Sequence, residues 1–180
     1  MNLPNRLTVL RVCMIPFFVI FLLTDWGGEA GNYIALAIFI IASVTDLLDG
    51  FIARKYHLVT NFGKFMDPLA DKLLVCAAMI CLVENGKLAA WVVIVIMSRE
   101  FVISGFRLVA SDNGIVIAAS YWGKFKTVFQ MVMICLLIAD LGGMFKILEQ
   151  VSIWIALALT VISMVDYLLK NKKVWKEGSK

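Results

Sequence analysis

The sequence predicts an all-α integral membrane protein, a bundle of six transmembrane helices with both termini in the cytoplasm. Of its 180 residues, 62% are hydrophobic and only 17% are charged, whereas a soluble domain typically has about 45–50% apolar and about 25% charged residues. The mean hydropathy is +0.90. The apolar residues form runs that are too long for strands and lack the alternating pattern of a membrane β-barrel.

Six apolar runs account for most of the chain. Because a bilayer core about 30 Å thick needs roughly 20 residues per helix, we expect one span in each of the runs 7–23, 33–52, 69–83, 88–109, 122–139 and 147–169. The first run resembles a secretory signal, but its charges are interleaved with apolar residues and five more runs follow, so we expect it to be retained. The short connections leave no room for a soluble domain, which predicts a single domain over residues 1–180.

The distribution of lysine and arginine predicts the orientation. With both termini inside, fifteen of the seventeen basic residues lie on or nearer the cytoplasmic side, and only Lys87 and Lys146 lie outside. This is the arrangement that the positive-inside rule favours. We interpret the net charge of +4 as contact with anionic lipid head groups rather than with nucleic acid.

Four aspartates cluster where the second run ends and the third begins, in "TDLLDGFIARKYHLVTNFGKFMDPLADK". Asp46 and Asp49 share one face of a helix, and Asp67 and Asp71, four residues apart, share one face of the next. We therefore expect two carboxylate pairs from adjacent helices to face each other at one membrane depth.

A cation would make these carboxylates tolerable, since each costs about 2.5–3.5 kcal/mol near the bilayer. Oxygen ligands favour Mg²⁺ or Mn²⁺ and leave positions for substrate phosphates. Two such ions, about 3.5–4 Å apart, can hold the oxygens of a phosphoryl group. Gly50, Ala53 and Gly63 leave space for a bulky ligand, and Arg54 can bind a phosphate. The alternative, aspartates that act as helix caps or pair with nearby lysines, does not explain the spacing i, i+3, i+21 and i+25.

The pattern Asp46-x2-Asp49-Gly50-x2-Ala53-Arg54-x8-Gly63-x3-Asp67-x3-Asp71 resembles, without a departure, the signature of the CDP-alcohol phosphotransferases. These membrane enzymes join a CDP-linked group to an alcohol and release CMP.

The resemblance implies a site for two Mg²⁺ or Mn²⁺ ions at the four aspartates, with Asp71 also acting as the base for the acceptor hydroxyl. It places Gly50, Ala53, Arg54 and Gly63 along the CDP group. Asn5, Thr8 and Arg11, at the start of the first run, could also reach the nucleotide. Alternatively, Asn5 or Thr8 is a helix N-cap and Arg11 is a snorkelling membrane anchor.

The acceptor must be selected by other polar residues. Arg99 and Arg107 are eight residues apart in the fourth run, hence about 80° apart around the helix, and Lys124 lies near the start of the fifth. Together they suggest a cationic pocket for an acceptor that carries a phosphate. Lys124 and Lys126 could instead be ordinary positive-inside anchors. Glu100, next to Arg99, is expected to point elsewhere on the helix.

These stretches, with the opening "NLPNRLTVLR", are similar to the bacterial phosphatidylglycerophosphate synthases within the family. The resemblance implies CDP-diacylglycerol as donor, sn-glycerol 3-phosphate as acceptor, CMP as product, a homodimer, and a bacterial cytoplasmic membrane with the active site facing the cytoplasm. It assigns the acceptor phosphate to Arg99, Arg107 and Lys124. The same chemistry with inositol phosphate is the nearest alternative. A divalent-cation transporter is another, but the second half of the chain has no counterpart of the acidic cluster.

Overall fold

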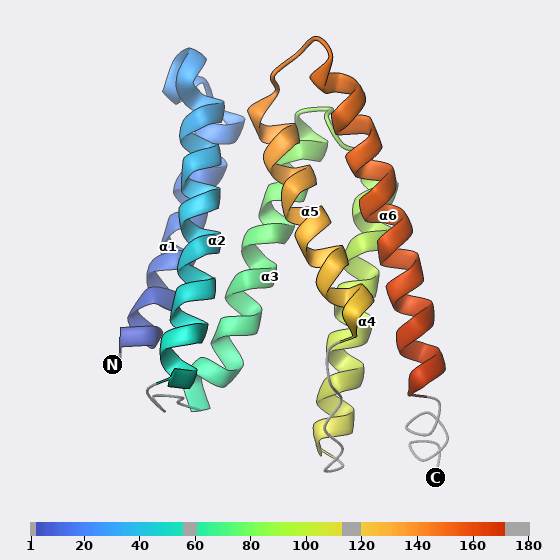
Figure 1. Cartoon of the computed structure of the whole chain (residues 1–180). Coiled ribbons are helices and arrows are strands. Elements are labelled where there is room, and N and C mark those ends of the chain that lie inside the picture. The colour runs from blue at the N-terminus through green and yellow to red at the C-terminus, as the bar shows by residue number, and fades with distance from the viewer. Residues whose placement is uncertain (1–2, 56–60, 113–119, 172–180) are drawn as a thin grey trace. The chain divides into compact units, whose positions relative to one another are not determined.

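The computed structural model describes residues 3–55, 61–112 and 120–171, without the side chains of 3–6, 29, 46–55, 61–68 and 111–112. These residues form helices joined by short connections, with no strand in the described ranges (Figure 1). The helices are α1 (Leu3–Leu23), η1 (Asp25–Ala30, a 3₁₀ helix), α2 (Gly31–Lys55), α3 (Asn61–Glu84), α4 (Ala90–Asp112), α5 (Tyr121–Ala139) and α6 (Phe145–Lys170). The prediction of an all-helical protein is therefore confirmed.

Helices α5 and α6 are each long and apolar enough to cross a membrane by themselves. Shorter apolar helical stretches occupy Leu7–Leu23 and Gly31–Thr45. The polar residues that interrupt α3 and α4 lower their hydropathy, and these are the residues that the sequence marks as functional. Six spans, cytoplasmic termini and a single domain stay predictions.

Helix α3 begins much earlier than the sequence pattern indicates. We expected a span from residue 69, but the helix begins at Asn61. The pattern followed apolar residues, whereas the first two turns of α3 are polar and glycine-containing. Gly63 and Asp67 therefore lie within the helix, in register with Asp71.

The described chain forms two compact units, and the first contains Met1–Leu88 with Ile134–Leu141. In this unit α1 packs against both α2 and α3 (Figure 1). The rings of Phe18 and Phe39 are 5.9 Å apart. Ala35 and Ala42 on α2 are fully buried, so the two helix backbones approach closely beside the aromatic pair.

Polar contacts join the connections at one end of the first unit. The Asn85 side chain donates to the carbonyl of Leu22 at 3.1 Å, and Lys87 pairs with Asp140 at 3.1 Å. The ends of α1, α3 and α5 therefore meet at the same end of this unit.

The second unit contains Ala89–Met133 with Gly142–Lys180. Helices α4 and α6 pack side by side, and aromatic pairs lie near both ends of their contact. The rings of Trp91 and Trp154 are 6.2 Å apart, and those of Phe106 and Tyr167 meet edge to face at 5.7 Å. Between these pairs α6 presents small polar residues to α4, which is where the charged residues of α4 lie.

Candidate functional site

The aspartate signature lies on two consecutive helices of the first unit. Asp46 and Asp49 are in the last part of α2, whereas Asp67 and Asp71 are in the first half of α3. The backbone is helical at all four positions, so the two members of each pair are about one helical turn apart. Helices α2 and α3 also contact each other.

Most side chains of the signature lie outside the described ones, namely Asp46, Asp49, Gly50, Ala53, Arg54, Gly63 and Asp67, together with Asn5. The side chain of Asp71 is described and is half-buried. No group of three or more metal-ligating side chains occurs among the described residues. The donor set still fits a hard divalent cation, because four carboxylates on two contacting helices offer oxygen ligands and little else.

Thr8 and Arg11 point into the first unit rather than toward its surface. Both are 1% exposed, and the Arg11 Nε donates to the carbonyl of Ala42 at 3.3 Å. Ala42 lies one helical turn before Asp46, so the guanidinium of Arg11 approaches α2 beside the start of the signature.

The N-cap and anchor alternatives for these residues are wrong. Helix α1 begins at Leu3, so Asn5 and Thr8 lie inside it and cannot be its cap. A snorkelling arginine extends toward the membrane surface, whereas Arg11 is buried against α2. Burial is consistent with the predicted role beside the nucleotide.

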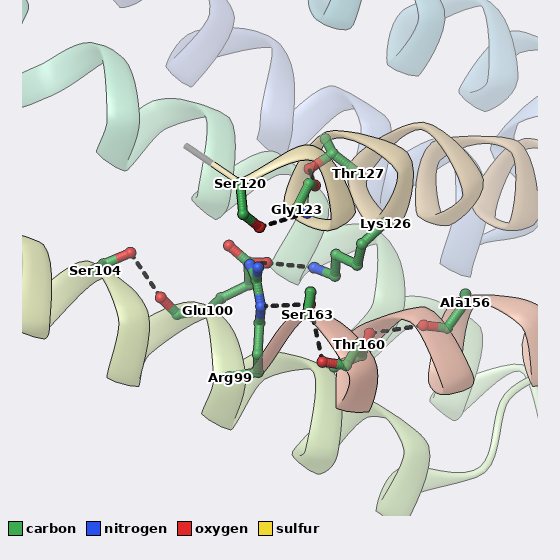
Figure 2. Close-up of polar contacts among 10 residues, drawn as sticks. All are labelled: Arg99, Glu100, Ser104, Ser120, Gly123, Lys126, Thr127, Ala156, Thr160 and Ser163. Carbon is green, nitrogen blue, oxygen red and sulfur yellow. Dashed lines mark hydrogen bonds and ion pairs between the residues drawn. The ribbon is translucent and has the colours of Figure 1, made fainter. Parts of the chain in front are cut away.

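Arg99 lies in the second unit, with its guanidinium held on two sides. The Nε donates to the Ser163 hydroxyl of α6 at 3.1 Å, and Nη1 donates to the Glu100 carboxylate at 2.9 Å (Figure 2). Ser163 in turn donates to the carbonyl of Thr160 at 2.9 Å, so its lone pairs are free to accept from Arg99. The arginine side chain is only 10% exposed.

The first turn of α5 lies next to the guanidinium of Arg99. A Cβ atom placed on Gly123 would lie 3.3 Å from Nη2 of Arg99 and 3.5 Å from the Ser120 hydroxyl. Lys124 follows directly and is exposed, with its Nζ 5.6 Å from the centre of the Tyr121 ring. The structure thus brings the backbone next to Lys124 into contact with Arg99.

Arg107 is exposed, two helical turns beyond Arg99 on α4. Next to Arg107, the ring of Phe106 meets the ring of Tyr167 edge to face at 5.7 Å. Tyr167 is 3% exposed, and its hydroxyl has no hydrogen-bond partner among the described residues. A buried phenol whose hydroxyl lacks a partner among the described residues, and whose ring packs on the neighbour of Arg107, is a candidate donor to an anion. A role for Tyr167 was not predicted from the sequence, because a tyrosine in an apolar run resembles an ordinary core residue.

Glu100 and Lys126 form an ion pair between α4 and α5, in which the lysine is buried and the glutamate is half-buried (Figure 2). The expectation that Glu100 points away from Arg99 is wrong, because one carboxylate oxygen accepts from both Arg99 and Lys126. The idea that Lys126 is a surface anchor is also wrong, since this residue is 1% exposed. Long side chains can bend toward a common partner even where the helix positions diverge.

Comparison with known proteins agrees with the signature. The sequence model for CDP-alcohol phosphatidyltransferases matches residues 1–162. The chain is 47% identical to the CDP-diacylglycerol–glycerol-3-phosphate 3-phosphatidyltransferase of Bacillus subtilis, over 99% of both chains. It is 41% identical to the enzyme of that name from Haemophilus influenzae, over 93% of this chain and 91% of the relative.

A probable phosphatidylglycerophosphate synthase of Mycobacterium tuberculosis is 42% identical, over 94% of this chain and 81% of the relative. These similarities extend over nearly the whole chain and therefore include the helices of both compact units. The chain belongs to the CDP-alcohol phosphatidyltransferase family.

Proposed function

We propose that this protein transfers a phosphatidyl group from CDP-diacylglycerol to sn-glycerol 3-phosphate, giving phosphatidylglycerophosphate and CMP. The observation that carries the proposal is the complete signature on two contacting helices in a chain that matches an enzyme of this named activity over its full length. The acceptor hydroxyl oxygen attacks the β-phosphorus of the donor. The bond from this phosphorus to the bridging oxygen breaks, and CMP leaves.

The donor side of the proposed site belongs to α1, α2 and α3. Two divalent ions, Mg²⁺ or Mn²⁺, held by the four aspartates would neutralise the pyrophosphate and make the incoming hydroxyl more acidic. In this proposal Asp71 takes the hydroxyl proton, for which a carboxylate within hydrogen-bond reach is suited. Gly50, Ala53, Arg54 and Gly63, with Asn5, Thr8 and Arg11, line the CDP group.

The acceptor side belongs to α4, α5 and α6. Arg99, Arg107 and Lys124 bind the phosphate of glycerol 3-phosphate, and we add the Tyr167 hydroxyl to this group. Arg99 gives the best support, since its guanidinium is nearly buried and is fixed by Ser163 and Glu100. A buried cation of this kind is suited to an anionic ligand.

We further propose six spans in the cytoplasmic membrane of a bacterium, with both termini and the active site on the cytoplasmic side, in a homodimer. The ion pair between Lys87 and Asp140 supports this topology, because the positive-inside rule puts both of their connections on the outer side. The apolar helices α5 and α6 support membrane insertion.

The test is CMP release by the purified protein from CDP-diacylglycerol with Mg²⁺. Glycerol 3-phosphate, inositol phosphate, inositol, serine and no acceptor are compared, with Asp71→Asn as the inactive control. Release only with glycerol 3-phosphate, lost in the variant, is the expected result. Release with inositol phosphate instead would keep the reaction but overturn the acceptor, and no release from folded protein would overturn the function.

A further inference from the structure

Arg99, Glu100 and Lys126 form a connected trio of charges. Lys126 Nζ and Arg99 Nη1 both donate to the same carboxylate oxygen of Glu100. The side chains are 2%, 10% and 20% exposed for Lys126, Arg99 and Glu100 respectively. Figure 2 shows the carboxylate between the two cations, at the place where the first turns of α5 cross α4.

Stability alone is a poor explanation for this trio. Removing charges from water costs several kcal/mol per ion, roughly, so apolar residues of similar size often hold helices together equally well. Joining α4 to α5 would also need only one cation opposite Glu100. The second contact, to Arg99, orients a guanidinium that Ser163 already holds from α6.

The contacts to Ser163 and Glu100 leave one amino group of the guanidinium, Nη2, without a hydrogen bond to a described residue. Nε and Nη1 carry the bonds to Ser163 and Glu100, whereas Nη2 makes no hydrogen bond to any described residue. Nη2 lies next to Gly123, where a Cβ would approach it to 3.3 Å. A fixed guanidinium whose Nη2 group can still donate is suited to bind a phosphate, because little side-chain freedom remains to be lost on binding.

The charges of the trio add up to one positive charge. Without Lys126, Arg99 would be the only cationic partner of Glu100 among the described residues, and the charge of Arg99 would be largely neutralised. Lys126 therefore supplies the counter-charge that lets Arg99 be oriented by a carboxylate and still attract an anion.

We propose that Glu100 and Lys126 are positioning residues that fix Arg99 for the acceptor phosphate, and that they determine the preference for a phosphorylated acceptor. This inference rests on the proposed function. Neither residue touches the reacting atoms, and both act through the guanidinium of Arg99.

The experiment compares wild type with Lys126→Met, Glu100→Gln and the double variant in detergent, using glycerol 3-phosphate and glycerol as acceptors. Lys87→Met is the matched control, because it removes a lysine from a different ion pair, the one with Asp140. One charge-assisted hydrogen bond is worth enough to predict that Lys126→Met raises the KM for glycerol 3-phosphate by about 10- to 100-fold. The KM for CDP-diacylglycerol and the weak activity with glycerol should change by less than about threefold.

The double variant keeps the test decisive if a single variant leaves an unpaired charge that prevents folding. It contains no charge opposite Arg99, so it is expected to fold and to bind glycerol 3-phosphate better than Lys126→Met does. Equal losses with both acceptors, or a wild-type KM in folded Lys126→Met, would overturn the proposal. If the wild-type protein itself shows no transfer to glycerol 3-phosphate, the proposed function fails, and the positioning role falls with it.

Discussion

Replacing Gly123 by alanine is expected to separate stability from acceptor binding. The added Cβ would lie 3.3 Å from Nη2 of Arg99, closer than an ordinary contact between such atoms. The guanidinium must then move by a few tenths of an ångström. Because Ser163 holds Nε and Glu100 holds Nη1, the movement strains two hydrogen bonds.

The magnitude follows from those bonds. Each contributes about 1–3 kcal/mol where a charged group takes part, and partial loss amounts to about 1 kcal/mol, so we expect the KM for glycerol 3-phosphate to rise about fivefold. Stability should not fall. Alanine in a helix is about 0.5–1 kcal/mol more favourable than glycine. The cap, in which the amide of residue 123 donates to the Ser120 hydroxyl, remains possible.

The assay measures CMP release against acceptor concentration, with the thermal midpoint in the same detergent. Gly105→Ala is the matched control, because a Cβ there would meet no atom within 4 Å and lies on another face of α4. It should gain stability without a change in KM. A wild-type KM in Gly123→Ala would refute the reasoning that Arg99 binds the acceptor through its Nη2 edge.

Three further predictions concern metal, nucleotide and helix capping. Chelation with EDTA should abolish CMP release, and Mg²⁺ or Mn²⁺ should restore it and raise the thermal midpoint, since a ligand of the native state stabilises it; a metal-independent rate would contradict the role of the aspartates. Arg11→Met should raise the KM for CDP-diacylglycerol at least several-fold, with little change for the acceptor, and the opposite pattern would remove Arg11 from the nucleotide side. Ser120→Ala should lower the free energy of unfolding by about 1 kcal/mol through the lost N-cap, measured by thermal or denaturant unfolding in detergent, and an unchanged value would show that the cap from Ser120 is dispensable.

The helices could be predicted from the sequence because each needs a long apolar run, and the bounds of α5 and α6 lie within two residues of the predicted ones. The start of α3 could not be predicted in this way. Its first turns carry polar residues of the signature, so the apolar run starts at residue 69 although the helix already starts at Asn61. A method that follows apolar residues therefore misplaces the start of a helix whose first turns are polar.

The signature could be recognised from spacing alone, since all of its positions lie within one stretch of the chain and on two consecutive helices. The acceptor side is different, because its residues come from three helices. Arg99 and Arg107 stood out as charges in an apolar run, and Tyr167 did not, since only its three-dimensional surroundings show that its hydroxyl lacks a partner.

The pairing of Glu100 with Lys126 shows that helix angles do not predict the contacts of long charged side chains. Adjacent residues diverge by about 100° around a helix, which led to the expectation that Glu100 turns away from Arg99. However, that angle describes Cβ directions, and the carboxylate and the guanidinium are several bonds farther out. A buried lysine opposite them gives the carboxylate a reason to bend back, because an unpaired charge in the interior costs far more than the rotamer that pairs it. Within a largely apolar helix, therefore, the neighbours of a charged residue are decided by where the nearest opposite charge lies, and here that charge is 26 residues away in sequence.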